Sequence, residues 1–586
     1  MSALTTSADG FLLHGEPFRI ISGAMHYFRV HPDLWADRLR KARLMGLNTV
    51  ETYVPWNLHQ PDPDGPLVLD GLLDLPRYLR LAHDEGLHVL LRPGPFICAE
   101  WDDGGLPAWL VADPDIRLRT GDPRFTTAVD RYLDALLPPL LPYMAEAGGP
   151  VIAVQVENEY GAYGDDTAYL KHLEQAFRTR GVEELLFTCD QADPEHLAAG
   201  ALPGLLATAT FGSRVDRNLA ELRRHQPEGP LMCAEFWIGW FDHWGGPHHV
   251  RDAADAATDL DRLLAAGASV NIYMFHGGTN FGFTNGANHK HAYEPTVTSY
   301  DYDAALTECG DPGPKYHAFR EVIARHAQVP AEPVPAPSPK LPYTTVELTR
   351  RAPLLPHAGT LAKPLRAEDP ASMNDLGLHS GYALYRTTLD AAGGGLLHFA
   401  DGVGDRAQIF VDGSPVGVLE RERHDETLPV RARSGATLEV LVENMGGVNY
   451  GPRIGAPKGL LGPVTFNGTP LHGWDCHPLS LDSLDTVPFE ACDATTAAEP
   501  AFHHGTFDVD TPADAFLALP GWTKGQAWIN GFHLGRYWNR GPQRTLYVPA
   551  PILRPGTNDL VLLELHATTG TSARLTDTAD LGPEIG

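Results

Sequence analysis

Val151-Ile-Ala-Val-Gln-Val-Glu-Asn-Glu-Tyr160 is an apolar run that ends abruptly in carboxylates, and Pro230-Leu-Met-Cys-Ala-Glu-Phe-Trp237 repeats this pattern. Unbroken runs of Val, Ile and Ala are typical of strands that are covered on both faces, as in a parallel sheet. Glu157, Glu159 and Glu235 stand where such strands would end. In an eight-stranded α/β barrel the chemistry lies at the carboxyl ends of the strands. The two stretches therefore predict a barrel with acidic side chains at that end.

The same alternation continues through residues 1–327. Amphipathic segments such as Leu34–Met45 show helical spacing between the apolar runs. Strands are predicted at Phe18–Met25, Asn48–Val54, His88–Pro93, Val151–Val156, Leu185–Asp190, Leu205–Phe211, Leu231–Ala234 and Ser269–Phe275. This alternation predicts an N-terminal (β/α)8 TIM barrel as the catalytic domain.

A proline-rich stretch at residues 328–343 follows the barrel and predicts an extended linker. Beyond it, short β-branched and aromatic runs alternate with Gly, Pro and Asp turns, as in all-β domains. A weak repeat aligns residues 407–417 with 525–535, and both copies carry a hairpin-type Asp-Gly or Asn-Gly turn. We therefore expect two jelly-roll or β-sandwich domains, at 344–495 and 496–586.

The composition limits the partners. Lys and Arg number 45 against 74 Asp and Glu, which gives a formal net charge of −29. Nucleic acids and anionic membranes require basic surfaces, so we expect no nucleic-acid partner and no membrane partner. No apolar stretch is long enough to span a bilayer, and the first residues do not resemble a secretory signal. The 6 cysteines are scattered without a C-x-x-C pair, which predicts reduced thiols in a cytoplasmic protein.

Glu159 and Glu235 form the expected catalytic pair. A retaining glycosidase uses one carboxylate as nucleophile and one protonated carboxyl group as acid, about 5 Å apart. Like charges at that distance do not both ionise easily, so one pKa rises. In an extended strand Glu157 and Glu159 would point to the same side, which leaves Asn158 beside the acid. This chemistry needs no cofactor and no metal, and the histidine groups match no zinc-binding spacing.

Six motifs occur in the barrel: Thr52-Tyr-Val-Pro-Trp-Asn57, Gly94-Pro-Phe-Ile-Cys-Ala-Glu-Trp-Asp-Asp-Gly-Gly-Leu-Pro-Ala-Trp109, Gln155-Val-Glu-Asn-Glu-Tyr-Gly161, Ala234-Glu-Phe-Trp-Ile-Gly-Trp-Phe241, Tyr273-Met-Phe-His-Gly-Gly-Thr-Asn-Phe281 and Thr298-Ser-Tyr-Asp-Tyr-Asp303. Together they resemble glycoside hydrolase family 35, the β-galactosidases, in its compact bacterial form. The resemblance covers the whole barrel and extends more weakly over the β domains. It implies an exo-acting, retaining β-galactosidase with a galactose-binding-like C-terminal jelly roll, which either binds sugar or only supports the barrel.

The resemblance also implies roles for individual residues. Glu159 matches the general acid/base and Glu235 the nucleophile. The positions that match galactose-binding residues are Tyr53, Cys98, Ala99, Glu100, Asn158, Tyr273 and Tyr302. Tyr300 stands in the same motif and ranks lower. The family commonly has Glu where this chain has Gln60, a position that we expect to be structural.

The expected partner is a β-galactoside oligosaccharide, with β-1,3 linkage preference as a hypothesis, and a homodimer is left open. Some of the tryptophans near strand ends are expected to wall the pocket, because aromatic faces stack on sugars; they are Trp56, Trp101, Trp109, Trp237, Trp240 and Trp244. Two alternatives remain: an exo-β-glycosidase for another sugar such as glucosamine, and a sugar-binding protein without catalysis. The presence of both Glu159 and Glu235 argues against the second.

Overall fold

The computed structural model describes residues 2–492 and 499–586. Within these residues, parallel strands close into a barrel in the order β10-β12-β4-β5-β6-β7-β8-β9. Its strands are β4 (Ile21–Met25), β5 (Thr49–Tyr53), β6 (His88–Arg92), β7 (Val151–Gln155), β8 (Leu185–Gln191), β9 (Leu206–Thr210), β10 (Met232–Trp237) and β12 (Ser269–His276). The predicted TIM barrel is confirmed.

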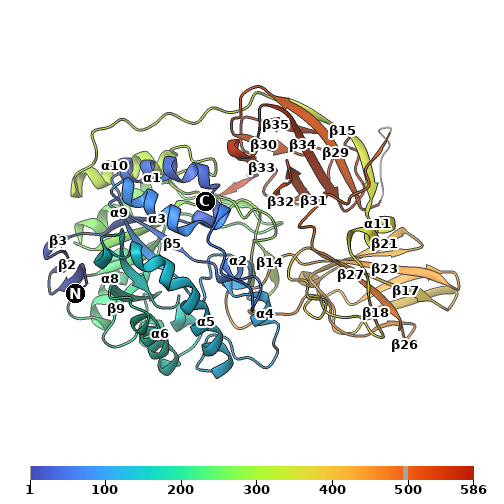
Figure 1. The fold of residues 1–586 in the computed structure, drawn as a ribbon, viewed down its shortest axis with the longest axis horizontal. Helices are drawn as coiled ribbons and strands as arrows, with labels where there is room; N and C mark the ends of the chain where they lie inside the picture. Colours follow the sequence, from blue (N-terminus) through green and yellow to red (C-terminus); the bar gives the residue numbers. More distant parts are fainter. Residues whose placement is uncertain (1, 493–498) are drawn as a thin grey trace.

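Helices pack around the outside of the barrel, in blue to green in Figure 1. The longer ones are α1 (Trp35–Met45), α3 (Leu75–Asp84), α5 (Pro123–Leu140), α6 (Thr167–Thr179), α8 (Val215–His225), α9 (Ala253–Ala265) and α10 (Pro314–His326). Gly46 ends α1 at φ 104°, in the left-handed region where glycine carries no steric penalty. Every residue of β5 and β7 is buried, which explains why these strands lack alternation.

The chain between α10 and β15 runs as an extended trace from the barrel to the C-terminal domain (Figure 1). Strand β15 (Thr344–Pro353) then pairs with β29 (Ala501–Val509) and β35 (Ser572–Thr576). The expected domain 344–495 therefore needs a correction at its start, because β15 lies in the C-terminal sheet. Its side chains Val346 and Leu348 belong to the same core cluster as that domain's strands. The expected boundary between residues 495 and 496 lies outside the described residues.

The two β domains are antiparallel, as predicted. The middle domain has one sheet ordered β16-β27-β17-β23-β20-β21 and a second ordered β22-β18-β25-β26. Five of these strands are β16 (Leu365–Ala367), β18 (Gly393–Phe399), β22 (Thr427–Ala432), β25 (Val464–Phe466) and β26 (Thr469–Pro470). The others are β17 (Tyr382–Leu389), β20 (Arg406–Val411), β21 (Ser414–Glu420), β23 (Ala436–Glu443) and β27 (Trp474–Leu479). The C-terminal sheet adds β30 (Ala515–Ala518), β31 (Lys524–Ile529), β32 (Phe532–Trp538), β33 (Thr545–Val548) and β34 (Gly556–Glu564).

The weak sequence repeat corresponds to two hairpins. Strands β20 and β21 turn at Asp412-Gly413, and β31 and β32 turn at Asn530-Gly531. All four turn residues have positive φ, as a primed hairpin turn requires. Among the described residues no helix combines the length and apolar character needed to cross a membrane. All six cysteines are free thiols.

Candidate active site

One cavity of about 350 Å³ opens at the carboxyl ends of the barrel strands, and all of the residues expected to form the site line it. They are Tyr53, Cys98, Ala99, Glu100, Asn158, Glu159, Glu235, Tyr273 and Tyr302. These residues come from strand ends or from the loops that follow β6, β7 and β12. Barrel closure therefore brings together motifs that are far apart in the sequence, such as those of Glu100 and Tyr300, whose side chains are hydrogen-bonded across 200 positions.

Glu235 lies on β10 and is only 5% exposed. Its Oε1 accepts hydrogen bonds from the Tyr53 hydroxyl at 2.7 Å and from Nη2 of Arg92 at 2.6 Å. Its Oε2 accepts from the indole Nε1 of Trp237 at 3.2 Å. Charge-assisted bonds of this kind fix both oxygens of a carboxylate. Glu235 is thus held rigidly with a cation beside it.

Glu159 has a different environment. Gln191 donates to its Oε1 at 2.7 Å and Thr210 at 3.4 Å, and both donors are uncharged. Burial raises the pKa of Glu159 well above its usual range, and the nearby Glu235 and Glu100 carboxylates raise it further. Both effects favour the protonated form of Glu159, which is the form that can donate a proton. The cavity therefore combines one carboxyl group whose protonated form is favoured with one that has an arginine partner.

Glu157 does not face this cavity, so the prediction that it points to the same side as Glu159 is wrong. Strand β7 ends at Gln155, and Glu157 and Glu159 have φ values of 61° and 47°. This left-handed backbone abolishes the alternation of an extended strand. Glu157 instead pairs with buried Arg119, whose Nε and Nη2 donate at 2.9 and 2.7 Å. It is a structural ion pair.

Cys98, Ala99 and Glu100 have consecutive φ values of 57°, 53° and 49°. Such backbone costs roughly 1 kcal/mol or more per residue and persists only where surrounding contacts enforce it. Nη2 of Arg29 donates to the Ala99 carbonyl at 2.5 Å, and its guanidinium lies 3.7 Å from the centre of the Tyr300 ring. The Tyr300 hydroxyl donates to Oε2 of Glu100 at 2.5 Å. Arg29 thus holds the backbone of this segment at Ala99, and Tyr300 holds the side chain of Glu100.

Burial also raises the pKa of Glu100 to about 7, although the hydrogen bond from Tyr300 opposes this shift. A carboxyl group with this pKa changes its protonation state near neutral pH.

Of the tryptophans expected to wall the pocket, Trp237 and Trp240 line the cavity. Trp56 and Trp101 are instead fully buried side chains of the barrel. Gln60 lies away from the cavity and accepts a hydrogen bond from Nε1 of Trp56 at 2.8 Å, which is a structural contact as expected.

Sequence reasoning missed several residues of the site. Arg92 carries a charge at the end of a predicted buried strand, a signal that could have identified it. Gln191 is an uncharged, partly buried residue at the end of β8, one position beyond the predicted strand. The remaining lining residues include Lys290, which comes from the loop after β12, and Tyr450, which belongs to the middle domain. Nothing near Tyr450 in the sequence indicates that it reaches the barrel.

Known proteins match this chain over nearly its whole length. Residues 10–326 match glycosyl hydrolases family 35, residues 370–480 match the first all-beta domain of beta-galactosidase, and residues 500–558 match its galactose-binding domain. Beta-galactosidase of Mus musculus is 44% identical over 594 residues, covering 96% of this chain and 91% of the relative. Beta-galactosidase of Homo sapiens is 45% identical over 598 residues, covering 97% and 87%. The chain belongs to family 35 of the glycosyl hydrolases.

Proposed function

We propose that this family 35 β-galactosidase is an exo-acting, retaining enzyme with Glu235 as nucleophile and Glu159 as general acid/base. The observation that carries the proposal is that the two carboxyl groups line one cavity in unlike settings. Arg92 and Tyr53 contact Glu235, while neutral donors contact Glu159. Environments that move the pKa values of two carboxyl groups apart indicate which group is the acid and which is the nucleophile.

The reaction then follows two displacements. In the first, a Glu235 oxygen bonds to the anomeric carbon while the glycosidic oxygen leaves with the proton of Glu159. In the second, Glu159 removes a proton from water, and the water oxygen displaces Glu235 from the anomeric carbon. Two inversions restore the β configuration, and both carboxyl groups return to their starting protonation.

Directed hydrogen bonds would select galactose. The Asn158 side-chain oxygen accepts from Arg92 at 2.6 Å and from Gln155 at 3.0 Å. These bonds leave its amide nitrogen to donate to the sugar 2-hydroxyl. Glu100, held by Tyr300, is available to accept from two hydroxyls. A sugar with one hydroxyl inverted leaves such buried groups unpaired, which gives stronger discrimination than shape alone.

The mechanism is tested by replacing Glu235 with glycine and adding azide. Azide would enter on the face that the carboxylate occupied, so we expect an α-galactosyl azide and partial recovery of turnover. NMR of early wild-type product should show β-galactose. Early α-galactose from the wild-type enzyme would overturn the retaining assignment.

The β-1,3 preference is part of the proposal. Turnover of β-1,3, β-1,4 and β-1,6 galactosides should favour the first, and equal turnover of all three would contradict it. Aryl β-galactoside compared with aryl β-glucosaminide separates this proposal from the glucosamine alternative. Sugar binding without turnover of either would support a non-catalytic protein. We also propose a cytoplasmic location, which cell fractionation tests. A homodimer is a further proposal, which a measurement of molecular mass in solution tests.

A further inference from the structure

Tyr450 reaches the catalytic cavity from outside the barrel. It follows β23 in the middle domain, in a loop that we call the mouth loop, residues 444–450. Within this loop, Nδ2 of Asn449 donates to the Cys98 sulfur at 3.5 Å. The backbone N–H of Gly447 donates to Oδ1 of Asp102 at 2.5 Å. The mouth loop is therefore attached to the same barrel motif that lines the cavity.

The mouth loop also lies against β13 (Ala287–His289), a short strand in the barrel loop after β12. The N–H of Ala287 donates to the Gly447 carbonyl at 2.9 Å, and the N–H of Asn449 donates to the Ala287 carbonyl at 3.0 Å. A Cβ on Gly446 would lie 2.3 Å from the Asn285 carbonyl oxygen, so the two backbones touch. The path of the mouth loop therefore depends on its contacts with the barrel.

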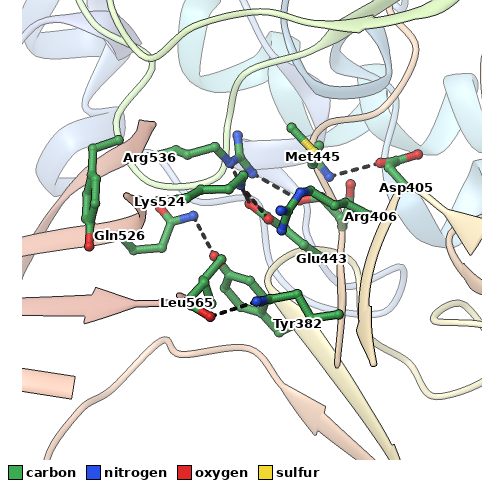
Figure 2. Close-up of polar contacts among 12 residues, drawn as sticks. Tyr382, Asp405, Arg406, Glu443, Met445, Lys524, Gln526, Arg536 and Leu565 are labelled. Atoms are coloured by element: carbon green, nitrogen blue, oxygen red, sulfur yellow. Dashed lines mark hydrogen bonds and ion pairs between the residues drawn. The ribbon is translucent and has the colours of Figure 1, made fainter. Parts of the chain in front are cut away.

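A buried ionic cluster lies at the start of the mouth loop. Glu443, the last residue of β23, accepts from Nζ of Lys524 at 2.6 and 2.5 Å and from Nε of Arg536 at 2.7 Å. Figure 2 shows both cations converging on this carboxylate. None of the three side chains is more than 2% exposed. Burial would raise the pKa of Glu443, but Lys524, Arg536 and Arg406 outweigh it and lower the pKa to about 2.

Arg536 connects all three domains. It lies on β32 of the C-terminal domain, and its Nη2 donates to the Asn444 carbonyl at 3.1 Å. Its Nη1 donates to the side-chain oxygen of Asn285 in the barrel at 2.7 Å. Nδ2 of Asn285 in turn donates to the Met445 carbonyl at 2.8 Å. One guanidinium thus orients the first two residues of the mouth loop, directly and through the barrel.

We propose that Arg536 and Glu443 are positioning residues for the galactosidase reaction, which hold the mouth loop so that Tyr450 closes one side of the substrate cavity. The C-terminal domain then contributes to substrate binding without touching the sugar. This inference rests on the proposed function. Its competitor is a cluster that only joins the domains and contributes stability.

A matched control lies on the same strand. Glu439 of β23 accepts from Nε of Arg386 at 2.7 Å and is also buried, but neither residue contacts the mouth loop in the described hydrogen bonds. Glu439→Gln and Glu443→Gln therefore make the same chemical change four positions apart. A purely stabilising role predicts similar kinetics for both variants.

The experiment measures kcat and KM for 4-nitrophenyl β-galactoside in both Gln variants, in Tyr450→Ala, and in Glu443→Gln combined with Tyr450→Ala. We expect Glu443→Gln to raise KM about 10-fold with kcat within about 3-fold, because lost binding common to ground and transition states raises KM alone. Glu439→Gln should retain wild-type values. The double variant should be no worse than Tyr450→Ala, since residues acting through one another are not additive.

Equal kinetics for Glu443→Gln and Glu439→Gln, or multiplying effects in the double variant, would overturn the inference. If Glu443→Gln does not fold, the same kinetic measurement is made on Arg536→Lys. This variant keeps the positive charge but loses the hydrogen bonds to Asn444 and Asn285. A wild-type KM in that variant would equally overturn the inference. Failure of the wild-type chain to cleave any β-galactoside would instead sink the proposed function.

Discussion

Arg92 donates from Nη2 to Oε1 of Glu235 at 2.6 Å, and the arginine side chain is only 1% exposed. The same guanidinium lies 3.5 Å from Oε1 of Glu51, a carboxyl group on the neighbouring strand β5. One cation at the carboxyl end of β6 therefore faces two acids. Burial raises the pKa of Glu51 to about 7, although Arg92 opposes the shift.

Replacing Arg92 with methionine should disable the enzyme at neutral pH. The variant leaves Glu235 buried without its cation. Removing one partner of a buried ion pair lowers the free energy of unfolding by about 3–5 kcal/mol. We expect kcat/KM to fall by at least about 10³-fold, because Glu235, the proposed nucleophile, loses both the cation and the donor that hold its Oε1. The measurement is kcat/KM for 4-nitrophenyl β-galactoside at neutral pH. A kcat/KM close to that of wild type would show that Arg92 does not serve Glu235.

The basic limb of the pH profile should report Glu159. Burial, Glu235 and Glu100 raise the pKa of Glu159, which favours its acid form, and this form is lost as the pH rises through the raised pKa. Glu159→Gln should abolish this limb. It should reduce kcat/KM for an alkyl galactoside by about 10²–10⁴-fold and kcat/KM for 4-nitrophenyl β-galactoside far less, because kcat/KM reports the first displacement, in which poor leaving groups need the proton. Equal losses of kcat/KM for both substrates would contradict the acid role.

The same substitution should stabilise the fold at high pH. A carboxyl group whose folded pKa is raised favours folding fully below its unfolded pKa and loses that contribution as the pH rises through the folded pKa. Glutamine carries no such charge. We expect the Tm of Glu159→Gln to equal that of wild type near pH 4 and to exceed it at pH 8. A Tm difference independent of pH would mean that the Glu159 charge does not strain the folded state.

The barrel was predictable because each of its strands produces a local pattern in the sequence. Strands buried on both faces appear as unbroken apolar runs, and the acids after β7 and on β10 lie toward the carboxyl ends of the parallel strands, which all meet at one end of the barrel. The direction of Glu157 was not predictable from strand alternation, because the backbone leaves the strand at Gln155 and enters the left-handed region.

Long-range partners were also not predictable. The alternation of β15 indicates a strand, but its partners β29 and β35 follow it by about 150 and 220 positions. Tyr450 has no local signal, because its place at the cavity depends on a junction between Glu443, Arg536 and Asn285 in three domains.

Arg29→Lys should impair catalysis more than stability. Lysine keeps the charge but cannot donate at once to the Ala99 carbonyl and to Oδ1 of Asn280, which Nε of Arg29 contacts at 2.8 Å. The strained segment ending in Glu100 then relaxes, and a displacement near 1 Å costs about 10²-fold in rate. We expect a loss of that size in kcat/KM for 4-nitrophenyl β-galactoside. Arg38→Lys is the matched control, because Arg38 is equally buried but binds Asp37 and the Cys309 carbonyl. Comparable kinetic losses in both variants would indicate general damage to the barrel and no specific support of the galactose site.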